Sequence, residues 1–193
     1  MKTFTVTKPA TKGESDELAL IEQAQQDSRK FQPLYERHYK AIFVFLLHRV
    51  GDKALTADLT SQVFLKALTN LKKFRYQGVP FSAWLYRIAL NESNEFFRKT
   101  KRDRLVSIDH ASVVDLYDEL TSDSQLDDLH AKLPAILKQL TIDEIQLIEL
   151  RFFEHRPFKA VAEILGITES HAKVKLYRLL EKMKKLFADR LNH

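Results

Sequence analysis

The stretch PFKAVAEILGITESHAKVKLYR, residues 157–178, constrains the fold more than any other part of the chain. Its apolar residues are spaced so that two short helices each bury one side against a common core. Gly166 falls between these helices, where the chain must turn sharply, and Thr168 follows at a position suited to cap the second helix. The pattern predicts a helix-turn-helix. The residues expected in its core are Val161, Ala162, Leu165, Ile167, Ala172 and Leu176.

The second helix of this motif has a polar outer face that carries three cations. A cationic helix that follows a tight turn suits the major groove of DNA. A pair of packed helices with a solvated charged face would show the same pattern, so both interpretations stay open at this point. The candidate DNA-contacting residues are Thr168, Glu169, Ser170, His171, Lys173, Val174, Lys175 and Arg178.

Helix breakers are scarce along the chain. Only four glycines and five prolines occur in 193 residues, of which 45% are hydrophobic, and this predicts an all-α protein. The chain has no cysteine, which excludes disulfides and thiolate metal sites and fits a reducing cytoplasm. We see no signal peptide, and the longest apolar run, residues 41–47, is too short to span a bilayer. We therefore expect a cytoplasmic protein without membrane insertion.

Charge is segregated along the sequence. Residues 29–104 carry 16 lysines and arginines against 6 carboxylates, whereas residues 105–128 carry 7 carboxylates and no lysine or arginine. Residues 129–193 are again basic, with 12 cations against 8 carboxylates. Two basic blocks joined by an acidic segment suggest two modules that bind a polyanion. A plain solvated linker between two domains would give the same composition.

The periodicity of apolar residues predicts two small helical domains joined by an acidic flexible linker. We expect helices at about 15–26, 31–50, 53–71, 80–101 and 129–140, a further helix that begins at Thr141, and a last helix that ends near residue 190. Thr141 and Glu144 have the spacing of a reciprocal capping box. The predicted organisation is a tail at 1–14, a domain at 15–104, the linker at 105–128 and a helix-turn-helix domain at 129–193.

A loop in the first basic block mixes cations with aromatic rings. Cations of this kind neutralise phosphates, and an aromatic wall can stack an extruded base for about 1–3 kcal/mol. Alternatively, the aromatic rings fold back onto the domain core. The residues concerned are Lys72, Lys73, Phe74, Arg75 and Tyr76.

The helix after this loop carries further candidates for DNA contact. Asn91 can contact a base edge through its amide, or it is a surface residue without a partner. Trp84 is the only tryptophan; its place in an apolar seam favours the core over a wedge against the duplex. The cations at the C-terminal end of the helix interact favourably with the negative end of the helix dipole and could also contact DNA phosphates. Its cations are Arg98, Lys99, Lys101 and Arg102.

Three stretches together resemble the extracytoplasmic-function sigma factors, the smallest class of bacterial transcription-initiation subunits. They are ADLTSQVFLKAL at 57–68, FSAWLYRIALNESNEFFRK at 81–99 and the helix-turn-helix at 157–178. The first is similar to the polymerase-binding helix of the family, the second to its helix for opening and reading the −10 element, and the third to its −35 reader. Their order, with an acidic linker and no domain between them, strengthens the resemblance.

The resemblance implies a sigma factor that directs core RNA polymerase to promoters, recognises −10 and −35 elements and helps to melt DNA. Its expected partners are the polymerase clamp and flap, promoter DNA and an anti-sigma factor. The linker would follow the RNA exit channel or serve as a plain tether.

The candidate residues for polymerase binding are Asp58, Leu59, Ser61, Gln62 and Phe64. Alternatively, Leu59 and Val63 are buried, and Asp58, Ser61, Gln62 and Lys66 alone are exposed. The candidates for the −10 element are Lys72, Arg75, Tyr76, Asn91, Arg98, Lys99, Lys101 and Arg102.

The sequence departs from the family pattern at a few positions. Ser61-Gln62 stands where Gln-Glu is usual, Glu95 replaces a frequent Asp, and Ala160 replaces a common Glu. His171-Ala172 replaces Thr-Val at the start of the recognition helix, so the preferred −35 sequence is expected to differ from the usual one.

The sequence carries no pattern that indicates an enzyme. None of the seven histidines forms an i, i+4 pair, and HExxH, GxSxG and glycine-rich phosphate loops are missing. We expect no catalysis, no metal and no cofactor. Two other functions stay open: a stand-alone helix-turn-helix regulator, which would bind an operator without polymerase, and a protein-binding adaptor with basic faces.

Overall fold

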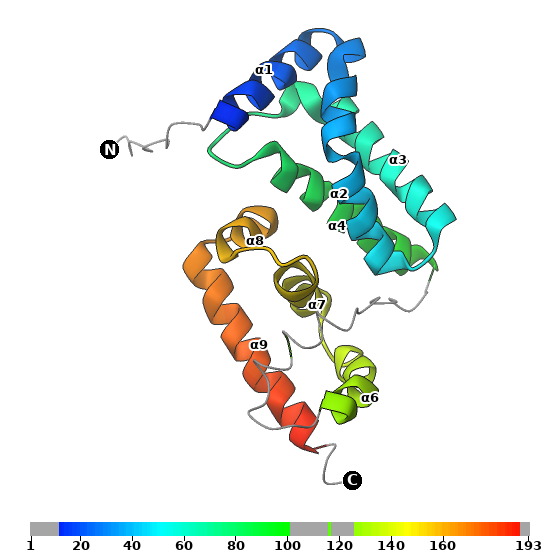
Figure 1. Ribbon diagram of the computed structural model, residues 1–193, viewed down its shortest axis with the longest axis vertical. Helices are drawn as coiled ribbons and strands as arrows, with labels where there is room; N and C mark the ends of the chain where they lie inside the picture. Colours follow the sequence, from blue (N-terminus) through cyan, green and yellow to red (C-terminus); the bar gives the residue numbers. More distant parts are fainter. Residues whose placement is uncertain (1–11, 101–115, 117–125, 190–193) are drawn as a thin grey trace. The chain divides into compact units, whose positions relative to one another are not determined.

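The computed structural model describes residues 12–100, Leu116 and residues 126–189, and every regular element among them is helical. The chain divides into two compact units, Met1–Ser107 and Ile108–His193. The predicted all-α class is therefore confirmed (Figure 1). The boundary between the units falls inside the predicted linker, residues 105–128, most of which lies outside the described residues.

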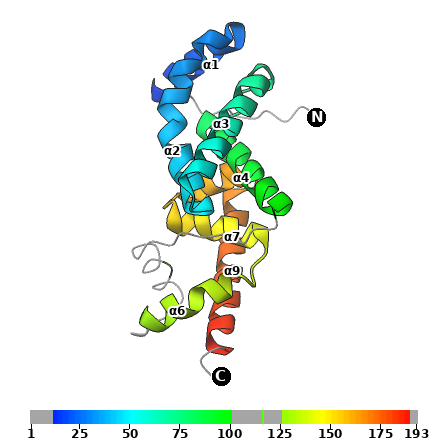
Figure 2. The same ribbon diagram turned by 90° about the vertical axis from the view of Figure 1, so that its right-hand side faces the viewer.

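Three long helices pack together to form the core of the N-terminal unit. α2, α3 and α4 all contact one another and lie side by side in Figure 2, while α1 contacts α2. The buried side chains come from the apolar seams expected for these helices, among them Leu34, Phe45, Val63 and Leu85. The elements are α1 (Lys12–Gln26), the 3-10 helix η1 (Ser28–Phe31), α2 (Gln32–Val50), α3 (Lys53–Asn70), the 3-10 helix η2 (Leu71–Lys73) and α4 (Phe81–Thr100).

The turn between α2 and α3 is fixed by local chemistry. Gly51 ends α2 with φ 72°, a conformation that a residue without Cβ adopts without strain. The Asp52 carboxylate then accepts a hydrogen bond from the Leu55 amide at 3.0 Å and caps α3. This cap sets the start of the helix that carries the predicted polymerase-binding residues.

A buried arginine ties α2 to α4. The Arg49 guanidinium donates from Nε to Ser93 Oγ at 3.0 Å and from Nη2 to Asn94 Oδ1 at 3.1 Å. It also lies over the Phe45 ring, 5.5 Å from the centroid. A buried charge needs hydrogen-bond partners of this kind, so the contact holds the C-terminal half of α4 in a fixed position.

The C-terminal unit packs its helices around the long last helix. α6, α7 and α8 all contact α9. The capping box is confirmed: the Thr141 amide donates to Glu144 Oε2 at 2.7 Å, and the Glu144 amide donates to Thr141 Oγ1 at 3.3 Å. The elements are α6 (Leu126–Leu137), α7 (Ile142–Ile148), the π-helix η3 (Glu149–Phe153), α8 (Phe158–Leu165) and α9 (Glu169–Asp189).

Some boundaries in this unit differ from the prediction. α6 runs from Leu126 to Leu137, so its start and its end each lie three residues earlier than in the predicted helix at 129–140. A hydrogen-bonded turn at 138–140 follows, because Thr141 must leave the helical conformation to cap α7. After Ile148 the backbone widens into η3, which a 3.6-residue periodicity cannot reveal.

The helix-turn-helix is formed by α8 and α9. Gly166 adopts φ 69° at the turn, and Thr168 Oγ1 accepts a hydrogen bond from the His171 amide at 3.2 Å. Of the predicted core residues, Leu165 and Ile167 are only half-buried, because both flank the exposed turn. The buried residues of the motif include Val161, Ala162, Ile164, Ala172 and Leu176.

Candidate nucleic-acid interface

The outer side of α3 presents a mixed polar and apolar surface. Asp58, Ser61 and Gln62 are exposed there, as predicted for polymerase-binding residues. The structure places Leu59 and Phe64 in the core instead; the Phe64 ring packs edge-on against Tyr35, with centroids 4.8 Å apart. The reason is that Leu59 belongs to the four-residue repeat of the buried seam of α3, and the seam is wide enough to include Phe64 beside Val63.

Leu65 belongs to this surface and was missed by the sequence analysis. It is among the most exposed large apolar side chains of the described residues. Together with Gln62 it borders a groove of about 500 Å³ between α3 and α4. The groove is lined by Leu55, Asp58, Leu59, Gln62, Leu65, Lys66, Glu92, Glu95, Phe96, Lys99 and Thr100.

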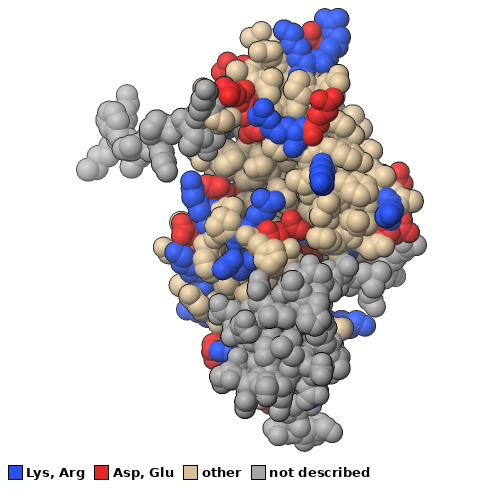
Figure 3. Space-filling model, viewed as in Figure 1, with Lys and Arg blue, Asp and Glu red and all other residues tan. Residues whose placement is uncertain are grey.

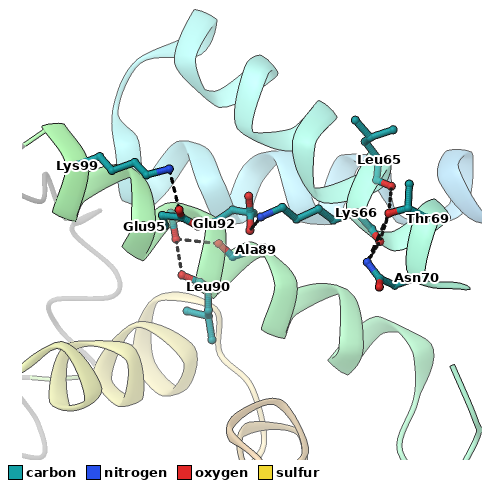
Figure 4. A network of polar contacts seen from close by, with 10 residues as sticks. Leu65, Lys66, Thr69, Asn70, Ala89, Leu90, Glu92, Glu95 and Lys99 are labelled. Atoms are coloured by element: carbon teal, nitrogen blue, oxygen red, sulfur yellow. Dashed lines mark hydrogen bonds and ion pairs between the residues drawn. The ribbon is translucent and has the colours of Figure 1, made fainter. Parts of the chain in front are cut away.

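An ion pair links α3 to α4 in the wall of this groove. Lys66 Nζ lies 2.6 Å from Glu92 Oε1, and the Glu92 side chain is only 8% exposed (Figure 4). The hydrogen bond to Glu92 raises the pKa of Lys66, so the lysine is firmly protonated. One turn further along α4, the Glu95 carboxylate lies 2.7 Å from Lys99 Nζ, whose hydrogen bond lowers the pKa of Glu95. Two carboxylates are thereby held on α4, the helix that carries the candidate residues Asn91, Arg98 and Lys99.

A second hollow of about 520 Å³ shares Lys66, Glu92 and Glu95 with the groove. The Phe74 ring contributes to it and packs against Trp84 at 5.1 Å and Phe81 at 5.4 Å. Phe74 therefore folds back on α4 and still offers a wall to the hollow, so the two interpretations of this loop are compatible. The hollow is lined by Lys66, Asn70, Lys73, Phe74, Trp84, Ile88, Asn91, Glu92 and Glu95.

The loop that bears Phe74 is held in place by polar contacts. Gln25 of α1 donates from Nε2 to the carbonyls of Leu71 and Phe74, at 2.9 and 3.0 Å. Arg75 donates from Nη1 to the carbonyls of Lys72 and Phe74, at 2.7 and 2.9 Å. Sequence reasoning missed Gln25, since nothing in a helical pattern indicates a contact across 46 residues.

Of the residues predicted to contact the −10 element, Asn91 lines this hollow, whereas Lys99 lines the groove between α3 and α4. Lys72 and Arg75 are exposed, and Tyr76 is half-buried. Asn91 is exposed and lines the hollow. Arg98 and Lys99 are exposed in the last turn of α4. Lys101 and Arg102 lie outside the described residues.

All eight predicted residues of the −35 site are exposed, along the turn and the first half of α9. Lys173 Nζ lies 2.7 Å from Glu169 and 5.6 Å from the centroid of the Phe158 ring, so this cation already has intramolecular partners. Tyr177, which the sequence analysis did not name, is exposed on the same helix. The eight residues are Thr168, Glu169, Ser170, His171, Lys173, Val174, Lys175 and Arg178.

Basic and acidic side chains are interspersed on the face of the molecule that Figure 3 shows. Blue and red side chains lie among wide uncharged areas on the described part of that face. Within the described ranges, no cluster of three or more His, Asp or Glu side chains could hold a metal ion. No helix in the same ranges is both long and apolar enough to cross a membrane.

Family models match both units. The model for sigma-70 region 2 matches residues 34–103, and the model for sigma-70 region 4 matches residues 136–185. Region 2 covers α2 to α4 with both hollows, and region 4 covers α7 to α9 with the helix-turn-helix. This pair of domains defines an RNA polymerase sigma factor.

Curated relatives narrow the class. The chain is 29% identical over 185 residues to the ECF RNA polymerase sigma factor BldN of Streptomyces coelicolor, covering 94% of this chain and 70% of BldN. It is 29% identical over 160 residues to the ECF sigma factor SigX of Bacillus subtilis, covering 80% of this chain and 82% of SigX. The chain therefore belongs to the extracytoplasmic-function sigma factors. A stand-alone helix-turn-helix regulator is not favoured.

Solved structures share the fold. The structure of CnrH in complex with the cytosolic domain of CnrY matches with a TM-score of 0.56 at 20% identity, over 89% of this chain and 96% of that one. The sigma factor RpoE of Bartonella quintana, in complex with the anti-sigma factor NepR, matches with a TM-score of 0.50 at 20% identity, over 83% of this chain and 98% of that one.

Proposed function

We propose that this sigma factor directs core RNA polymerase to promoters by holding a −10 element in its N-terminal unit and a −35 element on α9. The observation that carries the proposal is the pairing, in one chain, of a region 2 domain that has an aromatic-walled hollow with a region 4 domain that presents an exposed helix. The working domain boundaries are 15–104 and 129–193, joined by the acidic segment 105–128.

The hollow around Phe74 and Asn91 suits one base extruded from the melted strand. The ring of Phe74 or Trp84 supplies a stacking surface, and the Asn91 amide can hydrogen-bond to a base edge. Unpairing a base costs a few kcal/mol, and stacking returns about 1–3 kcal/mol. Phosphate contacts from Lys72, Arg75 and the basic end of α4 would supply the remainder.

The exposed side of α3 is the proposed docking surface for the polymerase clamp. Asp58, Ser61 and Gln62 offer polar contacts there, and Leu65 adds an apolar contact. The groove of about 500 Å³ that Leu65 borders would accept side chains of a partner helix. Buried Leu59 and Phe64 support this surface from below.

In the C-terminal unit, α9 would enter the major groove of the −35 element while the same unit contacts the polymerase flap. The exposed residues of its first half would face the groove, and the N-terminus of α9, which Thr168 caps by accepting a hydrogen bond from the His171 amide, would face the phosphates. No bond chemistry is required of any residue, so we propose a non-catalytic initiation subunit that acts in the cytoplasm without a cofactor.

An anti-sigma factor is a further proposed partner. CnrH and RpoE of Bartonella quintana were each solved with another protein bound, CnrY and the anti-sigma factor NepR. A protein that covered the α3 surface would block the clamp and keep the chain inactive. Pull-down of the chain with core polymerase, with and without a candidate inhibitor, would measure this competition.

Run-off transcription tests the proposal. Purified core polymerase is supplied with a promoter library, with and without this chain, and the start sites are sequenced. We expect new start sites that share −10 and −35 motifs at a constant spacing. If the chain never associates with core polymerase, or leaves start-site choice unchanged, the proposal fails.

A further inference from the structure

An uncharged stripe runs along the exposed face of α9, with Val174 near the middle of that face and Tyr177 toward one side. Successive residues of an α-helix are rotated by about 100°, so Ser170, Val174 and Tyr177 fall on nearly one line. Lys173 and Arg178 then lie on opposite sides of that line, each roughly 60–80° away. The stripe is therefore uncharged and mostly apolar, and a cation flanks it on each side.

The apolar side chains of this stripe have no place in the core of the unit. Val174 is 46% exposed and Tyr177 is 59% exposed, whereas Ala172, Leu176 and Leu179 on the other side of α9 are buried. Large apolar side chains this exposed are uncommon among the described residues. Two of them, one helical turn apart, on the helix expected to meet DNA point to an apolar ligand group.

A major groove offers one apolar group at a fixed place, the C5-methyl of thymine. A helix in the groove directs the middle of its face toward base edges and its flanks toward the phosphates of the two strands. Val174 and Tyr177 are separated by about 4.5 Å along the helix axis, close to the 3.4 Å between successive bases. They can therefore reach methyl groups on the same or on neighbouring base pairs.

We infer that Val174 and Tyr177 recognise thymine methyl groups in the −35 element, and so determine part of its sequence. The inference rests on the proposed function, because it assigns a ligand to the same helix face. Lys173 and Arg178 position the helix against the two phosphate backbones, while the apolar side chains of the stripe discriminate thymine from cytosine and from the purines.

Deoxyuridine provides the test, because it differs from thymidine only by the missing methyl group. A −35 element is first selected from a randomised library by holoenzyme that contains the full chain. Each thymine of that element, on either strand, is then replaced singly by deoxyuridine, and binding of the holoenzyme is measured by competition. We expect binding to weaken about fourfold at one or two positions, the factor expected for one buried methyl group.

Variants assign the effect to the two side chains. Val174→Ala or Tyr177→Ala should bind thymine and deoxyuridine equally at the sensitive position. Ile142→Ala, which removes an apolar side chain of similar exposure (52%) from α7, should keep the fourfold preference. All three residues are at the surface, and circular dichroism verifies that each variant folds.

The inference is overturned if no deoxyuridine weakens binding, if the selected element contains no thymine, or if both α9 variants keep the full preference. Equal losses on thymine and deoxyuridine templates in both variants would also overturn it, since the side chains would then contact protein. Holoenzyme that shows no preference at −35 would contradict the proposed function itself, and the inference would fall with it.

Discussion

The two proposed DNA sites have opposite shapes. In the N-terminal unit, Phe74 and the candidate residue Asn91 line a hollow of about 520 Å³. In its wall Lys66 pairs with Glu92, and Glu95 pairs with Lys99. In the C-terminal unit the candidate residues project from the turn at Thr168 and from the first half of α9, where Lys173 forms an ion pair with Glu169 on the same helix. A hollow suits one extruded base, whereas a projecting helix suits an intact duplex groove.

This contrast separates two ways of building a binding site. The face of α9 is set by helical periodicity and by the caps at Gly166 and Thr168, all of which are local. The hollow exists only because the loop after α3 returns to α4 and is held there by Gln25 of α1. Substitutions in the N-terminal unit should therefore change the geometry of the site, and substitutions on α9 should change only the contacts.

The largest effect is expected at Phe74. Phe74→Ala removes both a wall of the hollow and the packing against Trp84 and Phe81. Loss of stacking worth about 1–3 kcal/mol corresponds to roughly 5- to 150-fold less open complex, measured with permanganate footprinting on a selected promoter. Phe74→Leu keeps the apolar bulk and should retain the fold while it loses part of the stacking. Unchanged open-complex formation in Phe74→Ala would show that the hollow does not hold a base.

On α9, Arg178→Ala should weaken −35-dependent initiation more than Lys173→Ala. A single base or phosphate contact is worth about 1–3 kcal/mol, so we expect roughly a tenfold loss for Arg178. Lys173 already has Glu169 as a partner at 2.7 Å, which reduces its charge available to DNA, and a smaller loss follows. If the lost contact is to a phosphate, the salt dependence of binding should fall by about one charge. Equal losses in the two variants would contradict this assignment.

The same contrast explains what the sequence could predict. The helix-turn-helix, the Thr141 capping box and the exposure of all eight candidate residues for the −35 element follow from local patterns, and the structure agrees with these predictions. On α3, periodicity indicated a buried seam, but it could not show that Phe64 joins this seam and that Leu65 remains outside. The sequence could not predict the second hollow, because this hollow depends on the contact between Phe74 and Trp84 and on the pairing of Lys66 with Glu92.

Substitution of the Lys66–Glu92 ion pair tests whether charge holds α3 against α4. Lys66→Ala leaves the nearly buried Glu92 carboxylate without its counter-charge. Because the Lys66 side chain is 49% exposed, solvent screens the pair, and we expect a loss of about 1–2 kcal/mol in the free energy of unfolding. Urea unfolding followed by the fluorescence of Trp84, the only tryptophan, reports on this unit.

A matched double variant completes this test. Lys66→Ala combined with Glu92→Gln removes the unpaired charge and should recover most of the lost stability. If the double variant is no more stable than Lys66→Ala alone, the pair does not hold α3 to α4, and the geometry of the hollow depends on apolar packing alone.

The smallest effect is expected where the C-terminal unit supports α9 through Glu144. Burial would raise the pKa of this carboxyl, but hydrogen bonds from Lys182 and from the Thr141 amide outweigh it and lower the pKa below the ordinary 4.5. A lowered pKa means that the charged form stabilises the unit above pH 4.5 and that this contribution disappears as the pH falls through the folded-state pKa.

Glu144→Gln keeps an acceptor for the Thr141 amide and loses only the charge. Because Lys182 is partly exposed, we expect the free energy of unfolding to fall by about 0.5–1 kcal/mol at pH 7. Amide hydrogen exchange in α9 measures the difference, which should shrink at acidic pH, while Trp84 fluorescence of the other unit should not respond. A difference that persists unchanged at pH 3.5 would assign the effect to packing of the side chain instead of its charge.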